Sequence, residues 1–441
     1  YHTLQLFYLL MKDSCFIFFI NYIQYMKKHD ALKMDSLDRI SKVKKEFIYG
    51  KNSSSDKIYF CGNSLGLQHN SVKEKINSHL YQWQTKAVES HFSGPYPWVE
   101  VQNKIKVILK DLLGCSESEI AIMNALTVNL HLLMMSFYRP NKKKYKIIME
   151  ENAFSSDRYV VNSQLKLHGY NESDIILLKT SNDLIAEEYI IETIEKNKDD
   201  VCMLLLPGIQ YYSGQQFDLK KISIKCRECN IIFGVDFAHA IGNVKINLND
   251  IDLDFATWCS YKYLNSGPGG ISGIYINSRN LNNDMFRLEG WWGNKLSTRF
   301  EMRKKCDLDS SAEGWVISNP PVILLDIHLA SIEVFKKIGF DKLFSKSKSL
   351  TKFLYDGLTN ISNYRNYFKI LTPEDPERRG AQLSLYFLEN SEVIFEKLNK
   401  KFVIDYRKPN VLRIAPVPLY NSYEEVYMFV KELKEILNDI K

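Results

Sequence analysis

The sequence predicts an α/β protein in which a large domain, with a mainly parallel β-sheet covered by helices, is followed by a smaller α+β domain. From Tyr145 onward, short apolar runs alternate with stretches of helical periodicity. Strands that are separated by helices favour a parallel sheet with helices on both faces. After residue 306 the pattern changes, and the segment NPP (319–321) marks a boundary. A chain of 441 residues is long enough for two such domains.

The expected strands of the large domain are apolar runs without polar alternation, which is typical of strands buried on both faces. They cover residues 145–150, 201–207, 231–237, 255–260 and 270–276. The expected helices have apolar residues at helical spacing. They cover residues 98–114, 124–140, 155–169 and 187–197. Gly114 and Gly169 are stop signals for two of these helices, and Pro140 closes a third.

The smaller domain is expected to contain a helix, then strands such as AQLSLYFL (381–388), and a closing helix. The closing helix starts with Ser422 and Glu425, whose spacing is that of a capping box. Its apolar stripe consists of Val426, Phe429, Val430, Leu433, Ile436 and Leu437. We expect residues 26–80 to form an N-terminal arm, 81–306 the large domain and 307–441 the small domain.

The composition is that of a globular protein, with 45% hydrophobic and 25% charged residues. The net charge of +6 comes from scattered lysines, and the run at residues 142–144 is expected to be a solvated turn. No nucleic-acid-binding signature accompanies it, so we expect no nucleic-acid partner. Eight cysteines are too few for a disulfide scaffold, which favours a reducing compartment and a cytoplasmic location.

One cysteine pair, Cys226 and Cys229, has the CxxC spacing of a zinc or redox half-site. Zinc needs four ligands, and no second CxxC or paired histidines follow in the sequence. We therefore expect two packed residues near the end of a helix and no metal site.

The first 25 residues are strongly apolar and aromatic, but Lys12 and Asp13 interrupt the run. The two remaining pieces are shorter than the stretch a membrane span needs, so we expect no membrane association. No basic start and small-residue cleavage site mark a secretory signal. We expect residues 1–25 to be dispensable and the functional protein to begin near Met26 or Met34.

Lys262 lies between two tyrosines in CSYKYLNSGPGG (259–270), directly after an apolar run and before a glycine-rich turn. Lysine is rarely fully buried, so a lysine at this place needs a reason. One interpretation is an exposed loop lysine whose stem packs on the tyrosines. The other is a lysine that forms a Schiff base, because a desolvated amine loses its proton and becomes a nucleophile toward aldehydes.

Asp236 ends the apolar run IIFGVD upstream of Lys262. The two residues would therefore end two strands of one sheet, at the carboxyl edge where α/β proteins bind ligands. A carboxylate there suits the pyridinium nitrogen of pyridoxal phosphate, and a lysine suits its aldehyde. His239 in DFAH could stack on the ring or orient it. For Asp236 alone, a helix N-cap is an alternative.

A phosphate group would also need a binding site. The segment ALTVN (125–129) opens an expected helix, so Thr127 would bring its hydroxyl and the free N–H groups of the helix to an anion. An ordinary N-cap is the alternative for Thr127, and it is compatible with that role. Phe154 in NAFSSD follows a strand and could stack on the cofactor ring, although a lone phenylalanine is more often part of the core.

Several strings along the chain carry a specific resemblance. They are GNSLGLQ (62–68), MNALTVNLHLLM (123–134), DFAHAIGN, WCSYKYLNSGPGG, GWWGN with LSTRF, ISNPP and RIAPVPLYNS. In this order and spacing they resemble the kynureninase family, whose members are fold-type-I pyridoxal phosphate enzymes similar to class V aminotransferases. The similarity runs from about residue 57 to the C-terminus.

The resemblance implies pyridoxal phosphate as cofactor and the hydrolysis of L-kynurenine or 3-hydroxy-L-kynurenine. The products would be L-alanine and anthranilate or 3-hydroxyanthranilate, a step of tryptophan catabolism and NAD biosynthesis. By motif, Lys262 would carry the cofactor and move the Cα proton, and Asp236 would keep the ring nitrogen protonated. Tyr261 would contact the phosphate and handle protons late in the cycle. Arg413 in LRIAPVP would bind the substrate carboxylate in a bidentate manner.

The family also implies a homodimer with shared active sites, in which Trp291 and Asn319 reach the site from the second subunit. The cofactor-binding residues carried over by motif are Leu126, Thr127, Phe154, Ser155, Ser156, Asp157, Pro207, Tyr212, Asp236, His239, Tyr261, Lys262, Trp291 and Asn319. The substrate-binding residues carried over are Ser64, His91, Asn319 and Arg413.

Pro207 in LLPGIQYYSG is a departure from the family pattern, which usually has a hydroxyl residue there. Proline has neither a hydroxyl nor a backbone N–H. One hydrogen bond to the cofactor would be missing, worth about 1 kcal/mol net. We therefore expect somewhat weaker cofactor retention but no loss of function.

Asn319 and His91 match positions that contact the aromatic ring of the substrate in family members that prefer 3-hydroxykynurenine. A site built to bind a hydroxyl leaves a buried polar group unpaired with the lesser substrate. We therefore expect a preference for 3-hydroxykynurenine. The alternatives are a turn-capping asparagine and an ordinary loop histidine.

Two other interpretations of the whole chain remain. A related desulfurase or lyase would need a mobile nucleophilic cysteine well after Lys262, and only Cys306 follows, in the charged segment RKKCDLD. A degenerate homologue without activity would not be expected to keep Lys262, Asp236, Tyr261 and Arg413 together.

Overall fold

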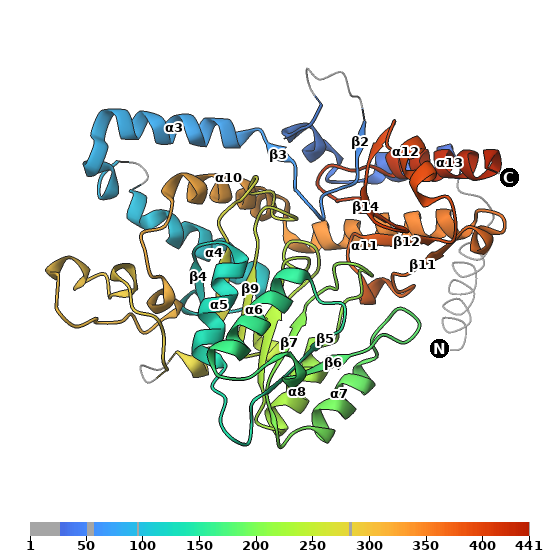
Figure 1. The fold of residues 1–441 in the computed structure, drawn as a ribbon. Helices are drawn as coiled ribbons and strands as arrows, with labels where there is room; N and C mark the ends of the chain where they lie inside the picture. Colours follow the sequence, from blue (N-terminus) through green and yellow to red (C-terminus); the bar gives the residue numbers. More distant parts are fainter. Residues whose placement is uncertain (1–26, 51–56, 95–96, 282–284, 441) are drawn as a thin grey trace, which may run out of the picture.

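A large mixed β-sheet and a smaller antiparallel sheet organise the chain (Figure 1). The computed structural model describes residues 27–50, 57–94, 97–281 and 285–440. The prediction that residues 1–25 are dispensable lies outside the described residues. Within the described part of the chain, no helix is long and apolar enough to cross a membrane.

The large sheet of the described chain has seven strands in the order β4-β10-β9-β8-β7-β5-β6. These strands are β4 (Ile120–Ile122), β5 (Lys146–Glu150), β6 (Ile175–Leu178), β7 (Val201–Pro207), β8 (Ile232–Asp236), β9 (Phe255–Trp258) and β10 (Gly273–Ile276). The pairs β6–β5, β5–β7, β7–β8 and β8–β9 are parallel. In this sheet β10 runs antiparallel to both β9 and β4. The predicted α/β class with a mainly parallel sheet is therefore confirmed.

Both faces of this sheet are buried, as the unbroken apolar runs predict. Along β7, Met203 and Leu205 belong to one buried cluster, whereas Leu204 and Leu206 belong to the other. Each successive side chain thus points to the opposite face. Helices α4 (Val101–Leu113), α7 (Glu187–Lys196), α8 (Leu219–Glu228) and α10 (Val322–Ile338) contribute to the first cluster, and α5 (Leu126–Phe137) and α6 (Ser155–Leu167) to the second.

The predicted strands and helices of this region are confirmed with small changes of boundary. The expected strand 255–260 ends at Trp258, before the turn that carries Lys262. Gly114 ends α4 in the left-handed conformation that favours glycine. The strands β4 and β6 were not predicted, since runs of three and four residues are too short to give a periodic signal. The predicted packing of Cys226 and Cys229 near the end of a helix is confirmed, because both are buried at the end of α8.

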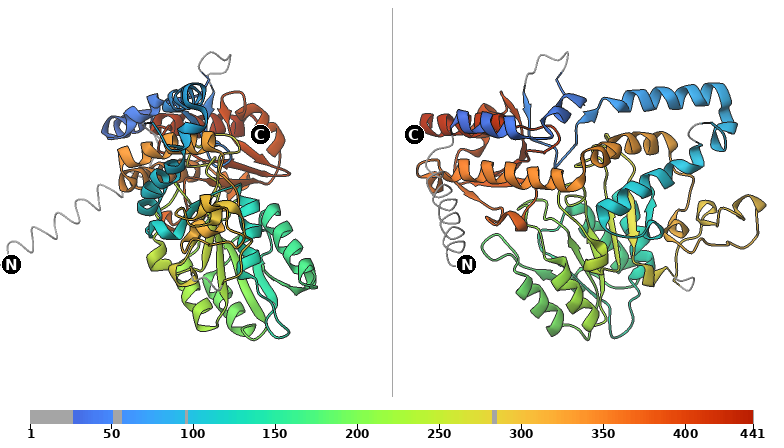
Figure 2. Two further views of the ribbon diagram at one scale, coloured as in Figure 1. Left: turned by 90° about the vertical axis from the view of Figure 1, so that its left-hand side faces the viewer. Right: turned by 180° about the vertical axis from the view of Figure 1, so that it is seen from behind.

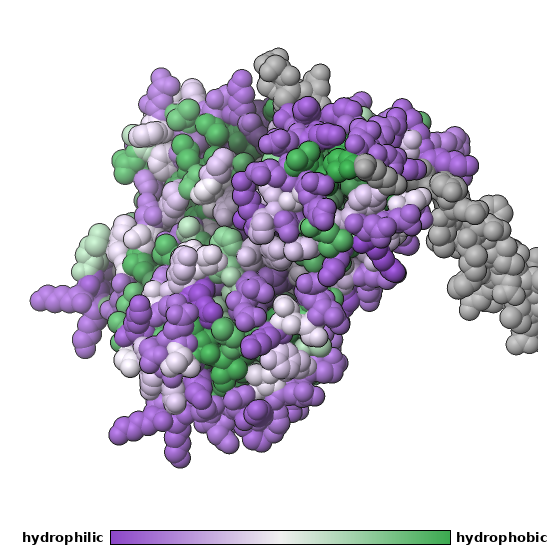
Figure 3. All heavy atoms as spheres, turned by 45° about the vertical axis from the view of Figure 1, so that its right-hand side comes forward, coloured by the Kyte–Doolittle hydropathy of each residue, from purple (hydrophilic) through white to green (hydrophobic). Residues whose placement is uncertain are grey.

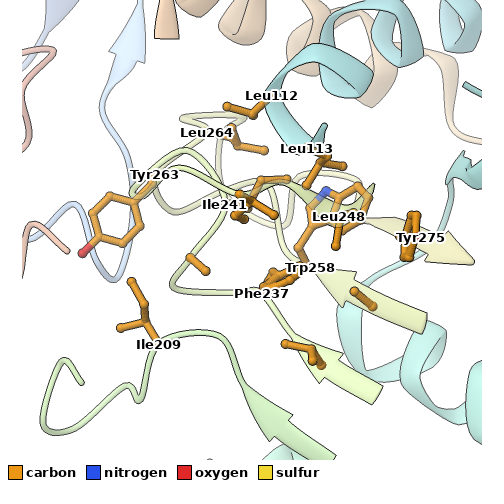
Figure 4. Close-up of a cluster of buried hydrophobic side chains, with 14 of the residues drawn as sticks. Leu112, Leu113, Ile209, Phe237, Ile241, Leu248, Trp258, Tyr263, Leu264 and Tyr275 are labelled. Carbon is orange, nitrogen blue, oxygen red and sulfur yellow. The ribbon is translucent and has the colours of Figure 1, made fainter. Parts of the chain in front are cut away.

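Apolar side chains fix the turns that follow β8 and β9. Figure 4 shows Ile241, Leu248, Trp258 and Leu264 gathered with Leu112 and Leu113 of α4. Phe237 and Tyr263, which are the direct neighbours of Asp236 and Lys262, are buried in the same cluster. The core therefore fixes the backbone on which the two predicted site residues lie.

The small sheet has the order β11-β12-β15-β14 and is antiparallel. Its strands are β11 (Phe368–Ile370), β12 (Leu383–Phe387), β14 (Asp405–Arg407) and β15 (Val411–Ile414), and its helices are α11 (Phe340–Thr359), α12 (Ser391–Leu398) and α13 (Tyr423–Asp439). The predicted capping box at Ser422 and Glu425 is present, and the apolar stripe of α13 is buried. The predicted α+β character of this region is confirmed.

Helix α2 (Lys28–Leu37) of the N-terminal arm packs against this small domain. The carboxylate of Asp35 accepts hydrogen bonds from the backbone N–H groups of Tyr423 and Glu424, at the start of α13. Asp38 pairs with the buried Lys346 of α11 at 2.8 Å. The proposed boundary between residues 306 and 307 stays a prediction, since α10 beyond it packs on α4 of the large domain.

Two segments project from the same side of the large sheet (Figures 1 and 2). They are α3 (Ser71–Lys86) with the turn after it, and the segment 286–302. The rings of Phe92 and Phe300 connect the segments, with centroids 5.5 Å apart. Figure 3 shows one face of the molecule, on which polar residues predominate and apolar residues form separate groups.

Candidate active site

The carboxyl ends of the parallel strands converge on one cavity, which is where α/β sheets bind their ligands. Glu150, Pro207 and Asp236 are the last residues of β5, β7 and β8, and Lys262 follows β9. The cavity is lined by Leu126, Thr127, Glu150, Phe154, Ser156, Asp157, Pro207, Ile209, Tyr211, Asp236, Ala238, His239, Cys259, Tyr261 and Lys262. Ten of the residues predicted from the sequence are in this set.

The amine of Lys262 points into the cavity, and its Nζ lies 3.0 Å from Nε2 of His239. Its Nζ is also 5.8 Å from the ring centre of Phe154 and 5.9 Å from that of Tyr261. The interpretation of Lys262 as an exposed loop residue is therefore wrong. Backbone contacts fix its turn: a Cβ on Gly66 would come within 2.3 Å of the Lys262 carbonyl oxygen, so only glycine allows the segment 62–68 to pack there.

Asp236 is buried, and its Oδ1 accepts a hydrogen bond from the N–H of Ala238 at 2.6 Å. Residues 238–243 of the described chain form turns and no α-helix, so the alternative interpretation of Asp236 as a helix N-cap is wrong. Burial raises the pKa of Asp236, whereas the positive charge of Lys262 opposes this rise. Any additional cation in the cavity would therefore stabilise the ionised form of Asp236.

His239 is buried beside Lys262. Burial lowers the pKa of His239 well below its ordinary value, and the positive charge of Lys262 lowers it further. The imidazole is therefore neutral at pH 7, and its Nε2 can accept a hydrogen bond from the lysine. A neutral acceptor orients the amine of Lys262 but adds no negative charge. The positive charge of Lys262 therefore still stabilises the carboxylate of Asp236.

Two helices start at the cavity, and both lack a side-chain cap. Ala125 is the N-cap of α5 and Phe154 is that of α6, and neither makes a capping hydrogen bond. Thr127 and Ser156 lie in the first turns, and their hydroxyls are 2.5 Å apart. Free N–H groups, two hydroxyls and two positive helix ends together suit a phosphate. Because α5 begins at Leu126, Thr127 is its second residue, and the N-cap alternative for Thr127 is wrong.

Phe154 is 42% exposed, so it is no core residue. Its ring packs edge-on against Tyr211, with ring centroids 5.2 Å apart. Both rings line the same cavity as Lys262. Such an arrangement leaves an aromatic face available to a planar ligand.

Arg413 of β15 lies opposite Asp405 of β14 and is 1% exposed. Its Nε donates to Asp405 Oδ2 at 2.7 Å, its Nη1 to the carbonyl oxygen of Tyr211 at 2.7 Å, and its Nη2 to Ser64 Oγ at 3.4 Å. Arg407 also donates to Asp405, at 2.9 Å. We call Ser64, Tyr211, Asp405, Arg407 and Arg413 the arginine cluster. Burial alone would raise the pKa of Asp405, but its hydrogen bond to Arg413 and the positive charges nearby hold it below the ordinary value.

Other residues predicted from the sequence lie away from the cavity in this chain. Ser155 and Tyr212 are adjacent to lining residues but do not line it. Trp291 is exposed, and its indole N–H donates to the carbonyl oxygen of Arg299 at 2.8 Å. Asn319 is exposed, and His91 packs against Trp98 with ring centroids 5.0 Å apart. The projecting segments described above carry both Trp291 and His91.

Sequence reasoning missed three polar groups near the cavity. Glu150 ends β5 in the same manner as Asp236 ends β8, so the rule that identified Asp236 could have found it. Tyr211 lines the cavity in place of the neighbouring Tyr212. Asp405 gave no signal, because its partners lie on β15 and in the segment 62–68, far away in sequence.

The fold and the cavity define an enzyme of the class V aminotransferase type, with a lysine and an aspartate at the carboxyl edge of the sheet. The family model of the class V aminotransferases matches residues 58–387, and that of the kynureninase C-terminal domain matches residues 343–433. Curated kynureninases from Flavobacterium johnsoniae and Rattus norvegicus are 42% and 40% identical over 92% of this chain, covering 97% and 93% of their own lengths. The Homo sapiens kynureninase is 42% identical over 88% of this chain and 85% of its own.

The chain belongs to the kynureninase family. Solved structures support the fold at low identity: the apo structure of a cysteine desulfurase from Thermococcus onnurineus has a TM-score of 0.74 at 16% identity and covers 91% of this chain and 99% of that one. A structure of the lyase C-DES with glycine covalently linked to its PLP cofactor has a TM-score of 0.73 at 14% identity, covering 86% and 96%. The resemblance and the fold class predicted from the sequence are confirmed.

Proposed function

We propose that this chain is a pyridoxal-phosphate-dependent hydrolase that cleaves L-kynurenine and 3-hydroxy-L-kynurenine to L-alanine and the corresponding anthranilate. The observation that carries this proposal is the presence of Lys262 and Asp236 in one cavity, with a phosphate-type site at the N-termini of α5 and α6. Membership of the kynureninase family supports the choice of substrate and reaction.

The residues present fit the cofactor. Burial raises the pKa of Asp236, so a cationic group beside it would stabilise its carboxylate. The first turns of α5 and α6 offer free N–H groups, and Phe154 presents an exposed ring. Asp236 would hold the ring nitrogen, Thr127, Ser156 and Tyr261 the phosphate, and Lys262 the aldehyde carbon. Pyridoxal phosphate, when bound, supplies a ring that withdraws electrons from the bonds around the substrate α-carbon.

The chain's own residues position the substrate and move protons. Lys262 is the residue that takes the Cα proton, since its amine is held by the neutral Nε2 of His239 at 3.0 Å. Asp236 keeps a proton at the ring nitrogen because an ionised carboxylate stabilises the positive charge beside it. Arg413 would orient the substrate carboxylate with the second N–H groups of Nη1 and Nη2, which are not bonded to Asp405 and each donate one other N–H to Tyr211 or Ser64. Tyr261 is a proton donor at neutral pH, since burial raises the pKa of its phenol.

Pro207 lines the cavity at the end of β7 and offers no donor there. The proposed function therefore includes one cofactor hydrogen bond fewer than the family pattern provides. The cofactor dissociation constant of this chain should decrease when Pro207→Ser restores the hydroxyl. A tenfold change would correspond to about 1.4 kcal/mol.

Desulfurase chemistry is the competing proposal within this fold, and the cysteines of the described chain do not support it. Cys306 does not line the cavity, and burial together with Glu289 raises the pKa of its thiol. Cys259 lines the cavity, but burial raises its pKa too. Both thiols are therefore poor nucleophiles at neutral pH.

The test is an assay of L-alanine and anthranilate release from both kynurenines, with L-cysteine as the competing substrate. The proposed function requires release from the kynurenines and loss of release in Lys262→Ala. Sulfur release from cysteine without alanine release from kynurenines would contradict it.

In the same assay, kcat/KM should favour 3-hydroxykynurenine over kynurenine by about tenfold or more. Asn319→Thr should reduce that ratio if Asn319 binds the hydroxyl.

The proposal includes a cytoplasmic homodimer that shares its active sites. The two projecting segments expose Tyr81, Trp83, Val88, Phe92, Trp291, Leu296, Phe300 and Met302. Exposed apolar groups of this size suggest a protein interface. A second copy is the occupant we propose, because these segments carry His91, a predicted substrate contact, and Trp291, a predicted cofactor contact, and the cavity of a single chain lacks both.

Mixed dimers test this arrangement. Lys262→Ala and Trp291→Ala should each be inactive alone. When the two inactive proteins are mixed and allowed to exchange subunits, about a quarter of the wild-type activity should return, since half of the sites in mixed dimers then hold both native residues. No recovery in a sample shown by light scattering to contain dimers would contradict sharing. A monomer at all concentrations would contradict the dimer itself.

A further inference from the structure

Glu150 is a buried carboxyl group to which no role has been assigned. It is 3% exposed and lines the cavity that holds Lys262 and Asp236. Its Oε1 is 3.5 Å from Nε2 of Gln210. Its Oε2 is buried and has no hydrogen-bond partner among the described residues. A buried ionised carboxylate without such partners would be costly.

The side chain of Gln210 is fixed so that it can only donate to Glu150. Its Oε1 accepts hydrogen bonds from the N–H groups of Tyr212 and Ser213 at 2.6 and 2.7 Å. Its Nε2 is therefore the group that faces Glu150, and it is shared with the carbonyl oxygen of Asn152 at 3.0 Å. Glu150 thus receives at most one long, neutral hydrogen bond, which does little to stabilise a full negative charge.

The charges around Glu150 also disfavour its ionisation. Glu150 lines the cavity of Lys262 and also a second, neighbouring cavity that Gln210 lines. The titratable side chains that line these two cavities with it are Asp157, Asp183, Tyr211, Tyr212, Asp236, His239, Cys259, Tyr261 and Lys262. Lys262 is the cation in this set of described residues, and it acts on Asp236 and Asp157. Burial raises the pKa of Glu150 to about 8, and the negative charge of Asp236 adds to the effect.

We infer that Glu150 carries a proton at neutral pH and is a positioning residue that leaves the negative charge of the cavity on Asp236. Glu150, Asp157 and Asp236 form what we call the carboxyl cluster, in which a single cation cannot balance three anions. Asp236 has the N–H of Ala238 at 2.6 Å and the charge of Lys262, so it holds the charge most easily. Asp157 has an Oδ1 without a partner among the described residues, like Glu150. The value of this arrangement for a pyridinium ring rests on the proposed function, whereas the protonation of Glu150 does not.

The test uses infrared difference spectra of the cofactor-free protein, in which a protonated carboxyl gives a C=O stretch separate from the carboxylate bands. The spectrum of wild type minus Glu150→Gln should contain the protonated band at pH 6.5 and lose it by pH 10. Glu187→Gln is the matched control, because Glu187 is equally buried but pairs with Arg378. Its difference spectrum should show a lost carboxylate band at both pH values. A carboxylate band for Glu150 at pH 6.5 would overturn the inference.

Thermal unfolding of the same cofactor-free proteins gives a second readout. The folded protein binds a proton at Glu150 that the unfolded chain has released above about pH 4.3. The stability of the wild type should therefore fall relative to that of Glu150→Gln as the pH rises from 5 to 8, and the difference should be constant above about pH 9. Parallel Tm curves over this range would overturn the inference. If the kynurenine assay fails while both readouts hold, the proposed function fails and the inference stands.

Discussion

The carboxyl cluster and the arginine cluster differ in how their buried charged groups are paired. In the arginine cluster, all three nitrogen atoms of the Arg413 guanidinium donate to protein groups, and Asp405 accepts from two arginines. In the carboxyl cluster, Glu150 and Asp157 each keep an oxygen without a partner among the described residues. Native proteins rarely leave buried polar groups unsatisfied, so an exception indicates strain or a missing ligand.

The comparison shows which part of the site is complete before a ligand arrives. The arginine cluster is preorganised, because Asp405 and the carbonyl oxygen of Tyr211 hold Arg413 in one orientation. The carboxyl cluster has an excess of acidic groups over cations, so a cationic ligand would stabilise it. We therefore expect changes in the carboxyl cluster to affect cofactor chemistry and changes in the arginine cluster to affect substrate binding.

The largest expected effect is that of Lys262→Ala, which removes the cation that the carboxyl cluster depends on. Turnover should fall by at least about 10⁴-fold, the upper end of what a positioned proton carrier contributes. Borohydride should fix the cofactor on Lys262 of the wild type, and peptide mapping should locate it there. A label on another lysine would show that the assignment is wrong.

The contrast between these two clusters also shows how far the sequence alone could go. Asp236 and Lys262 were predicted together, because each follows an apolar run and parallel strands end at the same edge. Asp405 could not be predicted, since it becomes a partner of Arg413 only through the register of β14 and β15. The sequence predicts Tyr212 at the cavity, but Tyr211 lines it. The sequence could not distinguish the two, because a tight turn decides which of two adjacent side chains faces inward. Trp291 and Asn319 stay predictions, because the family resemblance places them at the site of a second subunit. His91 also stays a prediction, because it does not line the cavity of the described chain.

Asp236→Asn tests the carboxyl cluster without changing its shape. The amide cannot stabilise a positive charge at the ring nitrogen, so kcat should fall by about 10²- to 10³-fold. KM should change much less, because the arginine cluster is intact. Steady-state kinetics with kynurenine measure both, and a variant with near-normal turnover would rule out this role for Asp236.

Asp405→Asn tests the arginine cluster in the same isosteric way. Loss of the carboxylate charge weakens the hold on Arg413, so KM should rise by about tenfold or more, which corresponds to about 1.4 kcal/mol. The effect on kcat and on the absorbance of the bound cofactor should be small. Arg407→Gln is the control, since it removes a partly exposed donor and leaves the pair of Asp405 and Arg413 in place. If Asp405→Asn loses cofactor but keeps a normal KM, the arginine cluster supports cofactor binding and not substrate binding, and the proposed division of roles is wrong.

The smallest expected effects concern the N-terminal arm, which supports the small domain that carries the arginine cluster. A shortened chain beginning at Met26 keeps α2 whole, so its Tm and both kinetic constants should equal those of the full chain.

Asp35→Ala removes the carboxylate that caps α13 from outside the helix, which should cost about 1 kcal/mol and lower Tm by about 2 °C. A chain beginning at Met34 keeps Asp35 but loses most of α2, including the fully buried Ala31, so its Tm should fall further. KM should rise slightly in these last two variants while cofactor binding stays unchanged, since the contacts of α2 are with the small domain. Weaker cofactor binding in Asp35→Ala, or a lower Tm for the chain beginning at Met26, would show that the arm supports the carboxyl cluster as well.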